Sequence, residues 1–446
     1  MGLTTFELGG IHPPDHKELA SGSPIEVCKG PLKAIIPLSQ HIGAPCKSLV
    51  EVGQVLQIGQ QIGNPEGFVS APVHSSVSGK VSAIDTCTVA TGRVIPAIIV
   101  DNDKSEQWAP LEDDPGYLEK PPETLMKRIK AAGIVGMGGA TFPTHVKLSP
   151  PKEKTIDAVI INGAECEPYL TSDHRVMVER PRDVVNGLRI LMRVLGVNTG
   201  HIGIESNKPD AIAAIIAAAA EHPPSDHRER TMDIQVWTLE VKYPQGAEKM
   251  LIKAVLGREV PAGGLPMDVG AVVQNVGTAL AIYEACRSGK PLVERVVSVT
   301  GNGIKTPKNL LARIGTPISQ LIAECGGLKG GAAKIISGGP MMGFAVFSTD
   351  VPVMKGTSGI VVMLAQETSY GDKYGNCIRC GRCVDACPMG LMPLMLSLFS
   401  ERGHFEDAKS YNLFDCFECG CCTYVCPAKR PIVQQIRFAK TQVKPG

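Results

Sequence analysis

Nine of the fifteen cysteines lie between residues 377 and 426, and eight of them form two copies of one spacing. The spacing is C-x2-C-x2-C-x3-C-P, the ligand run of proteins that hold two [4Fe-4S] clusters, in which the fourth cysteine of each run binds the other cluster. It predicts one cluster on Cys377, Cys380, Cys383 and Cys426 (cluster 1) and a second on Cys416, Cys419, Cys422 and Cys387 (cluster 2).

Zinc binding and disulfide bonding are the alternative uses of so many cysteines. Zinc takes four thiolates per ion, typically as two C-x2-C pairs, which leaves the third cysteine of each run and the trailing prolines unexplained. Residues 1–6 contain no basic segment followed by an apolar core, so we expect no secretory signal and a reducing, cytoplasmic location in which disulfides are rare. Cys421 stands one position off the pattern and is interpreted as packing beside a ligand. The other six cysteines share no ligand spacing and are predicted to be buried thiols: Cys28, Cys46, Cys87, Cys166, Cys286 and Cys325.

Length and charge limit the class of protein. At 446 residues the chain is long enough for roughly three domains of about 150 residues each. Its 45 basic and 44 acidic residues give no net field that would attract nucleic acid or an anionic membrane surface. The longest apolar stretch, residues 211–220, is about half of the ~20 residues that a membrane helix needs, so we expect no direct membrane span.

The N-terminal part is predicted to be an extended arm without regular elements, residues 1–30, followed by a small all-β module, residues 31–105. The module has short alternating apolar runs separated by glycines. Its segments V-x-x-G-Q-x-L-x-x-G-Q and S-A-P-V resemble the barrel-sandwich hybrid of biotinyl and lipoyl domains. The turn that carries the modified lysine in those domains corresponds to residues 63–67, which contain no lysine, so we expect an unmodified module. Lys80 is interpreted as a surface residue.

From residue 121 to 290, helices alternate with short apolar strands, which predicts a Rossmann-like α/β domain with a parallel sheet. Ligands of such sheets bind at the carboxyl ends of the strands. Backbone N–H groups and a lysine suit a phosphate there, although each loop alone is more simply a glycine-rich turn or a capped helix. His222 and His227 lie in a proline-rich loop of this region, and we interpret them as solvent-exposed rather than metal-bound. The candidate loops are residues 133–147, with Gly136, Gly138, Gly139 and Lys147; residues 162–169, with Asn162 and Glu165; and residues 243–278, with Glu248 and Asn275.

Together these loops resemble those of the NADH-binding flavoprotein subunit of respiratory complex I. In that family the motifs G-x-G-G-A-x-F-P-x-x-x-K, N-x-x-E-x-E-P, Y-x-x-G-x-E and N-V-x-T surround FMN and NADH in this order, and all four occur here. Ala247 departs from the family, which has the first of two glutamates there. The resemblance implies that FMN contacts Gly136, Gly138, Gly139, Lys147, Asn162, Glu165 and Asn275, with Phe142 and Glu248 near the nicotinamide nucleotide.

Residues 291–366 resemble the β-grasp (SLBB-like) module that follows the flavin domain in the same family, and residues 371–446 hold the helical, ferredoxin-like domain with both cysteine runs. The whole multidomain α/β arrangement, including F-x-x-G-G-I-H-P-P from Phe6, resembles the RnfC family of the ion-translocating Rnf electron transport complexes. That resemblance implies a peripheral subunit at the cytoplasmic face of the cell membrane. Its implied partners are membrane-embedded subunits, ferredoxin and NAD(H).

The expected reaction follows from the cofactors. NADH gives two electrons as a hydride and each cluster takes one, so FMN placed between them accepts the pair and releases single electrons. We therefore expect an NAD(H)-dependent subunit of a ferredoxin:NAD+ oxidoreductase that transports Na+ or H+, with no catalytic side chain because FMN carries the hydride chemistry. Two alternatives stay open. One is a cobalamin reductase-type flavo-iron-sulfur protein, expected to begin near the glycine-rich loop, and the other is a relay subunit without NADH activity, which Ala247 favours.

Overall fold

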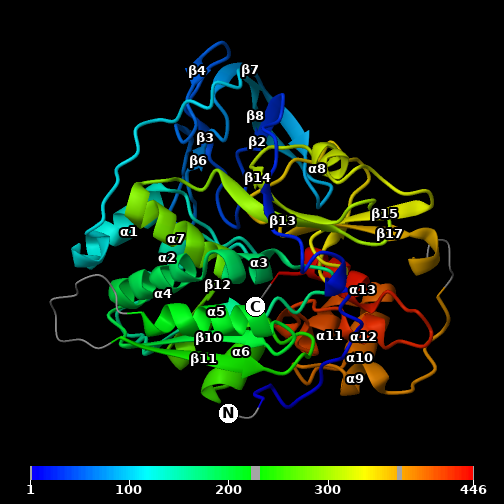
Figure 1. The fold of residues 1–446 in the computed structure, drawn as a ribbon. Coiled ribbons are helices and arrows are strands. Elements are labelled where there is room, and N and C mark those ends of the chain that lie inside the picture. The colour runs from blue at the N-terminus through cyan, green and yellow to red at the C-terminus, as the bar shows by residue number, and fades with distance from the viewer. Residues whose placement is uncertain (1–2, 222–231, 369–373, 445–446) are drawn as a thin grey trace.

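The computed structural model describes residues 3–221, 232–368 and 374–444, so His222 and His227 lie outside the described residues. Figure 1 shows an all-β module at the top, the α/β domain at the lower left, a second large sheet in the middle and the C-terminal helices α9 to α13 at the lower right. The predicted modules thus occupy separate regions, and the C-terminal helices lie beside the α/β domain although another module separates them in the chain.

The all-β module consists of two small sheets with the orders β2-β8-β7-β4 and β3-β5-β6. Alternate residues such as Ala34 and Ile36, and Ile98 and Val100, fill the core between them. The turn without a lysine joins β5 to β6, and Lys80 is exposed on β7, as predicted. The strands are β2 (Lys33–Pro37), β3 (Lys47–Ser48), β4 (Val55–Leu56), β5 (Gln61–Asn64), β6 (Val73–His74), β7 (Gly79–Thr88) and β8 (Val94–Asn102).

The N-terminal arm is more regular than predicted. It contains a short 3-10 helix, η1 (Lys17–Leu19), and strand β1 (Ile25–Val27), which pairs in parallel with β14 (Lys308–Arg313). The expectation of an arm without regular elements is therefore wrong for these residues. The partner strand belongs to a module far along the chain, so no local sequence pattern indicates the pairing.

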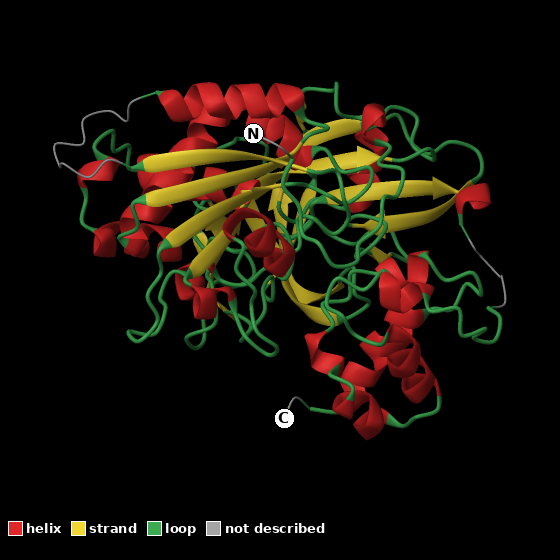
Figure 2. Ribbon diagram, turned by 90° about the horizontal axis from the view of Figure 1, so that it is seen from below, coloured by secondary structure: helices red, strands yellow, loops and turns green. Residues whose placement is uncertain are grey.

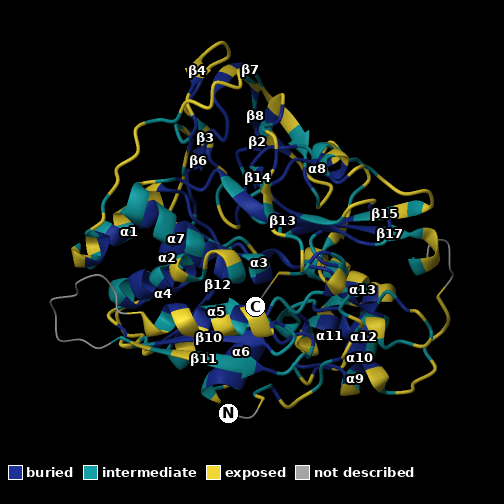
Figure 3. Cartoon of the chain, viewed as in Figure 1, coloured by how far each residue is buried: buried dark blue, intermediate teal, exposed yellow. Residues whose placement is uncertain are grey.

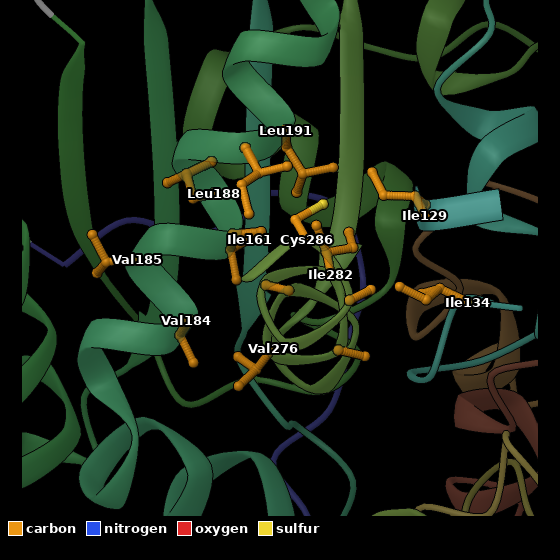
Figure 4. Packing of buried hydrophobic residues seen from close by; sticks show 14 of the residues in the cluster. Ile129, Ile134, Ile161, Val184, Val185, Leu188, Leu191, Val276, Ile282 and Cys286 are labelled. Carbon is orange, nitrogen blue, oxygen red and sulfur yellow. The ribbon is translucent and has the colours of Figure 1, made fainter. Parts of the chain in front are cut away.

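The α/β domain contains a parallel sheet with the order β11-β10-β9-β12, as predicted. Helices α4, α5 and α7 cover one face of it and α6 covers the other. Strand β10 is buried along almost its whole length (Figure 3), and Figure 4 shows Leu188, Leu191 and Ile282 of the covering helices packed near Ile161. The elements are α1 (Pro122–Ala131), α2 (Thr144–Lys147), β9 (Ala158–Gly163), α3 (Ser172–Glu179), α4 (Pro181–Leu195), β10 (Thr199–Glu205), α5 (Pro209–Ala220), β11 (Asp233–Leu239), α6 (Glu248–Leu256), η3 (Pro266–Val269), β12 (Ala271–Asn275) and α7 (Val276–Ser288).

The strand order of this sheet reverses between β9 and β12. The chain runs from β9 to β10 and β11 in one direction and then returns to add β12 on the other side of β9. Such a reversal opens a crevice at the carboxyl ends of the two strands, where ligands of α/β proteins bind. Asn162 and Asn275 are register partners at these ends, so two of the candidate loops start side by side.

The β-grasp-like module is built on a mixed sheet with the order β1-β14-β13-β17-β15-β16, to which the arm contributes β1. The sheet and α8 enclose an apolar core that includes Val299, Leu321 and Ile360. Figure 2 shows the strands in the middle of the molecule and the helices nearest the C-terminus at its edge. The elements are β13 (Glu294–Thr300), β14, α8 (Ile318–Glu324), β15 (Ala332–Ser337), β16 (Phe344–Ala345) and β17 (Gly359–Leu364).

The C-terminal domain consists of short helices around the cysteine runs. Helix α10 packs against α13, and their apolar residues, such as Leu396 and Ile436, share a core with cysteines of both runs. The helices are α9 (Arg382–Asp385), α10 (Pro393–Glu401), α11 (Phe405–Ser410), α12 (Cys421–Tyr424) and α13 (Ile432–Gln442).

Candidate functional site

The four cysteines predicted for cluster 1 line one pocket. Cys377, Cys380, Cys383 and Cys426 surround a space of about 430 Å³, part of it open to solvent. The first three come from the loop before α9 and from α9 itself, and Cys426 comes from the end of the second run. The fourth ligand therefore lies beside the run that precedes it in the chain, as the crossed assignment predicts.

The four cysteines predicted for cluster 2 also lie together. Burial, helped by the neighbouring thiols of Cys419 and Cys387, raises the pKa of Cys416 to about 11. Cys387 and Cys422 are buried in one apolar cluster, with Cys416 at its edge. Cys387 of the first run is therefore a spatial neighbour of the second run, which is the other half of the crossed arrangement.

Each set has the chemistry of a [4Fe-4S] site, namely four thiols from two segments in a mainly apolar setting. The fit lies in the residue types and their neighbourhood, since a cubane binds each of its four thiolates at a different iron corner. Within residues 3–221, 232–368 and 374–444, no group of three or more His, Cys, Asp or Glu side chains is arranged to hold a metal ion.

The two runs differ in what surrounds them, and we name residues 377–387 the outer repeat and residues 416–426 the inner repeat. Gly381 and Gly420 precede the equivalent helices α9 and α12 with φ of 80° and 82°, a region that favours glycine. A Cβ added to Gly381 would meet no atom within 4 Å, whereas one added to Gly420 would lie 3.0 Å from the carbonyl oxygen of Met341. The inner repeat is therefore packed against the β-grasp-like module and the outer repeat is open at this position.

The inner repeat also packs against the α/β domain. The hydroxyl of Tyr243, a buried residue, donates a hydrogen bond to the carbonyl oxygen of Cys419 at 2.7 Å. Cys421 is 0% exposed, and its thiol lies 3.9 Å from the carbonyl oxygen of Tyr243. Cys421 therefore packs beside a proposed ligand, as the sequence predicts.

The N-terminal arm reaches the same interface. A Cβ on Gly9 would lie 2.6 Å from the carbonyl carbon of Cys387, so only glycine allows this approach. The N–H of Gly10 donates to the carbonyl oxygen of Ala386 at 3.1 Å, and Ile11 exchanges two backbone hydrogen bonds of 2.8 Å with Tyr243. The arm thus joins the outer repeat's last cysteine to the α/β domain.

The glycine-rich loop lies over the carboxyl end of β12. A Cβ on Gly138 would lie 2.8 Å from Nδ2 of Asn275, so the loop approaches this side chain as only a glycine permits. Gly139 is open, because a Cβ there would meet nothing within 4 Å. Gly136 instead donates its N–H to the carbonyl oxygen of Phe142 at 2.9 Å and closes the turn. No described residue accepts from the N–H of Gly138 or Gly139, which fits a phosphate cradle.

Lys147 and Glu248 come together although they are far apart in the chain. The ammonium of Lys147 forms an ion pair with the carboxylate of Glu248 and donates to the carbonyl oxygen of Val273 at 2.7 Å. Both side chains are partly exposed. The lysine charge that the sequence assigns to a phosphate is thus balanced by the glutamate that the resemblance places near the nucleotide.

Asn162 and the segment after Tyr243 form the next part of the site. Nδ2 of Asn162 donates to the carbonyl oxygen of Gly246 at 2.7 Å, and the N–H of Gly246 donates to Sγ of Cys166 at 3.2 Å. Cys166 and Cys87 are only partly buried, unlike the prediction, whereas Cys28, Cys46, Cys286 and Cys325 are buried.

The carboxylate of Glu165 accepts hydrogen bonds from the protein backbone. It accepts from the backbone N–H groups of Asp173 at 2.8 Å and His174 at 3.1 Å, at the start of α3. Asn275 caps α7 through Gly277 and donates to the Asp173 carboxylate at 2.6 Å. Burial, together with the charge of Glu165, raises the pKa of Asp173 to about 7. These acids therefore hold the loops in place.

A cavity of about 1010 Å³, part of it open to solvent, lies between α3, α7 and β13. None of the nine residues predicted for the flavin and nucleotide lines it, but Asp173 and Gly277 do, and both contact Asn275. Arg295 lines it too, with its pKa lowered to about 10 by burial. The cavity adjoins the candidate site.

Three further residues organise the site and have no predicted role. The ammonium of Lys17 donates to the carbonyl oxygens of Glu165, Glu167 and Leu170. The Glu167 carboxylate accepts from the N–H groups of Met341 at 3.0 Å and Met342 at 2.8 Å, and burial raises its pKa to about 7. Glu167 and Tyr243 are fixed positions of the quoted motifs, which was a usable signal, whereas nothing in the sequence indicates Lys17.

Family comparisons agree with this architecture. The Nuo51 FMN-binding domain matches residues 129–284 and the 4Fe-4S dicluster domain matches residues 376–429. The RnfC barrel sandwich hybrid domain matches residues 5–105 and the SLBB domain residues 296–345. The fold and the site define an electron-transfer protein with an FMN-binding domain and a [4Fe-4S] dicluster domain.

Relatives of known class match almost the full chain. The C subunit of the Na(+)-translocating ferredoxin:NAD(+) oxidoreductase complex of Acetobacterium woodii is 48% identical over 440 residues, which cover 98% of this chain and 97% of the relative. The C subunit of the proton-translocating ferredoxin:NAD(+) oxidoreductase complex of Clostridium ljungdahlii is 49% identical over 436 residues, 97% of this chain and 93% of the relative. The chain belongs to the RnfC family, the C subunits of the ion-translocating ferredoxin:NAD+ oxidoreductase, or Rnf, complexes. The match over residues 5–105 does not fit the cobalamin reductase-type alternative.

The fold is also found in solved structures of NAD+-reducing [NiFe]-hydrogenase, in the H2-reduced and air-oxidized states. The TM-scores are 0.51 and 0.50 at 16% identity, over 75% of this chain and 65% and 66% of those chains. At this identity the likeness concerns the fold alone. In the described part of the chain no helix has the length and apolar character needed to cross a membrane.

Proposed function

We propose that this chain passes electrons between NAD(H) and its two [4Fe-4S] clusters through FMN, and that cluster 2 is the cluster nearer to the flavin. The observation that carries this order is the 2.7 Å hydrogen bond from Tyr243 to the carbonyl oxygen of Cys419. Tyr243 begins the short segment whose Gly246 contacts Asn162 at the proposed flavin site. One segment therefore touches both centres, while Cys380 of cluster 1 is exposed.

The proposed flavin contacts fall into direct and indirect ones. FMN, when bound, supplies the chemistry that converts a hydride pair into single electrons. No described residue accepts a hydrogen bond from the N–H groups of Gly138 and Gly139, so these groups can donate to the phosphate of FMN. Asn162 lies where the strand order reverses, and its side chain suits the ring or the ribityl chain of FMN. Phe142 and Glu248 face the nicotinamide nucleotide, with Lys147 as the countercharge. Gly136, Glu165 and Asn275 hold these loops in position through the turn, the α3 cap and the contact with Gly138.

We propose the same assembly for this chain that the relatives' names give for them. It acts as a peripheral subunit docked on membrane-embedded subunits at the cytoplasmic face, and it exchanges electrons with ferredoxin directly or through another subunit.

A relay function without NADH activity is the second candidate. The Lys147–Glu248 ion pair supports it, because Glu248, which is proposed for the nucleotide side, is already bound to Lys147. Ala247 removes one further carboxylate from the same place. In this case FMN would exchange electrons only with protein partners.

The deciding experiment is an anaerobic titration of the purified full chain. About eight irons and one FMN per chain, with flavin bleaching by NADH followed by cluster reduction, support the first proposal. Cluster reduction by dithionite without any NADH response supports the relay function. Lys147→Ala is expected to weaken FMN retention, and Lys33→Ala is the control, because Lys33 forms its ion pair with Asp101 in the all-β module, away from the loops. Equal flavin content in both variants would contradict the assignment of Lys147.

A further inference from the structure

Two buried cations of the β-grasp-like module contact the glycine-rich loop. Arg295 lies on β13 and is 4% exposed, and Lys355 lies between β16 and β17 and is 1% exposed. The ammonium of Lys355 donates to the carbonyl oxygen of Gly133 at 2.7 Å, and Nη1 of Arg295 donates to that of Met137 at 3.3 Å. Because burying a charge is unfavourable unless it is compensated, two such cations against one loop indicate a role in that loop.

The charge of Arg295 is directed at backbone groups. Its guanidinium donates to the carbonyl oxygens of Val296, Met137 and Lys355, the last at 2.6 Å. In the described part of the chain no carboxylate forms an ion pair with it. Burial lowers the pKa of Arg295 to about 10, so the guanidinium is charged at neutral pH. The peptide groups that accept from Arg295 therefore experience its full charge.

The Met137 carbonyl belongs to the same peptide group as the N–H of Gly138. A trans peptide group is planar, and its C=O and N–H bonds point in opposite directions. Because Arg295 holds the carbonyl, the N–H of Gly138 points away from Arg295, to a side where no described residue accepts from it. A hydrogen bond from a cation to the carbonyl also polarises the peptide group and makes its N–H a stronger donor. Arg295 thus orients and strengthens a donor that it does not touch.

The rest of the loop is held in the same position by close packing. The N–H of Met137 donates to the hydroxyl of Thr278 at 2.9 Å, so both sides of this residue are fixed. A Cβ on Gly356, next to Lys355, would lie 2.3 Å from Cγ2 of Thr141. The β-grasp-like module therefore touches the glycine-rich loop before and after the two glycines with free N–H groups.

We propose that Arg295 is a positioning residue for the phosphate of the bound flavin, acting through the peptide group between Met137 and Gly138, while Lys355 holds the beginning of the loop at Gly133. The inference rests on the proposed function, in which this loop binds the phosphate of FMN. A residue outside the flavin domain thereby controls flavin affinity. Because the effect passes through one N–H group of the phosphate cradle, it concerns the phosphate and leaves the ring contacts unchanged.

The test compares FMN with riboflavin, which has the same ring and ribityl chain but no phosphate. The full chain with both clusters is freed of flavin, and each ligand is titrated anaerobically by the quenching of flavin fluorescence. The unchanged chain should bind FMN at least about tenfold more tightly than riboflavin. Arg295→Gln should weaken FMN binding about tenfold and change riboflavin binding less than about twofold. Arg295→Lys keeps the charge and should weaken FMN binding only about threefold.

Arg189→Gln is the matched control. Arg189 is 5% exposed, and it donates to the carbonyl oxygen of Glu221 just after α5. Helix α5 leads from the end of β10 to the start of the parallel strand β11, so it ends at the edge of the sheet opposite the glycine-rich loop. The control therefore removes a buried guanidinium from carbonyl groups without touching the loop, and both flavins should bind it as they bind the unchanged chain.

Iron content and melting temperature of each variant are measured first. If Arg295→Gln does not fold, Arg295→Lys replaces it, and its smaller loss must again be confined to FMN. An equal loss of FMN and riboflavin binding would mean that Arg295 only stabilises the fold, and this result would overturn the proposal. Unchanged FMN binding, or an equal loss in Arg189→Gln, would overturn it as well. Because no NADH is present, a failure of NADH to bleach the flavin would contradict the proposed function and leave this comparison interpretable.

Discussion

The two cysteine repeats have one spacing and two environments. In the inner repeat, Gly420 packs on Met341, Cys421 is buried beside Tyr243, and the Cys419 carbonyl accepts a hydrogen bond. In the outer repeat, the matching Gly381 has no neighbour within 4 Å of an added Cβ, and Arg382 is exposed. Equal ligand sets therefore do not imply equal roles: packing makes one repeat an internal connection and leaves the other available to partners.

The largest effect is expected from removing the crossed ligands. Cys387→Ser lies in the outer repeat but should abolish cluster 2, as Cys419→Ser does, whereas Cys426→Ser should abolish cluster 1, as Cys380→Ser does. Each variant loses about four of eight irons. Only the cluster 2 variants should prevent NADH from reducing the remaining cluster, which dithionite still reduces.

EPR spectra of the four variants check this pairing. If Cys387→Ser resembles Cys380→Ser, each run binds its own cluster and the crossed assignment is wrong. If NADH still reduces cluster 1 in the absence of cluster 2, the inner repeat is not the connection to the flavin.

Replacing the residue after Gly420 in the inner repeat and the residue after Gly381 in the outer repeat should show how differently the two repeats are packed. Cys421→Arg buries an unpaired charge against Tyr243 and should cost about 3–5 kcal/mol of unfolding free energy. Arg382→Ala changes an exposed side chain and should stay within about 0.5 kcal/mol. Urea unfolding of the cluster-loaded chain measures both, and similar costs would mean that the two repeats are equally exposed in solution.

The hydroxyl of Tyr243 joins the α/β domain to the inner repeat. Tyr243→Phe leaves the buried carbonyl of Cys419 without its donor, which should cost about 1–2 kcal/mol, and it should slow cluster reduction by NADH while flavin bleaching is unchanged. Tyr374→Phe is the matched control, because that hydroxyl donates to Glu401 on the exposed side of the outer repeat. Stopped-flow absorbance follows flavin and clusters separately. A slower flavin step in Tyr243→Phe would assign Tyr243 to the nucleotide.

The repeat glycines allow a finer comparison. Alanine at Gly381 or Gly420 adopts a positive φ, at a cost of about 1 kcal/mol. Gly420→Ala must also move the Met341 carbonyl, which lies 3.0 Å from the added Cβ, and we expect roughly 1 kcal/mol more. Chemical denaturation gives the difference, and equal costs would indicate that the β-grasp-like loop does not hold the inner repeat.

The smallest effect is a pH dependence at the inner interface. Glu167 binds the loop that packs on Gly420, and its pKa is raised by burial from the ordinary 4.5 to about 7. Between these pH values the unfolded state loses the proton and the folded state keeps it, so the unfolding free energy should fall as pH rises from 4.5 to 7 and level off above 7. The slope stays below the limit of about 1.4 kcal/mol per pH unit for one group. The variant Glu167→Gln should lack this pH dependence of the unfolding free energy in melting curves at about pH 5, 6, 7 and 8. An identical slope in the variant would show that another group causes the pH dependence.

Local patterns predicted the elements whose partners are close in the chain. The parallel sheet, its helices and the β5–β6 turn follow from apolar periodicity and turn residues, and the pairing of cysteines follows from their spacing. Strand β1 could not be predicted in this way, because its partner β14 belongs to another module. The same reason applies to Lys17, whose ammonium finds three carbonyl groups only in the folded chain.

The flavin-site prediction treats every motif residue as a contact, whereas the structure gives several of them partners within the protein. Gly136 and Glu165 are occupied by the turn and by the α3 cap, and Lys147 is paired with Glu248. A motif records which residues are needed, and a residue that shapes a loop is needed as much as one that touches a ligand. Hydrogen-bond partners distinguish these cases, and they depend on the fold.

The arm across the interface has a consequence for how the molecule is made. Gly9 and Gly10 rest on Cys387 and Ala386, so these two residues of the arm complete their contacts only after the cysteine-rich domain has been synthesised. Cys387 is also a proposed cluster ligand, so we expect the arm to be held less firmly in chains that lack the cluster. A free arm would thus mark immature chains, and proteolysis of the arm would report on cluster assembly in the cell.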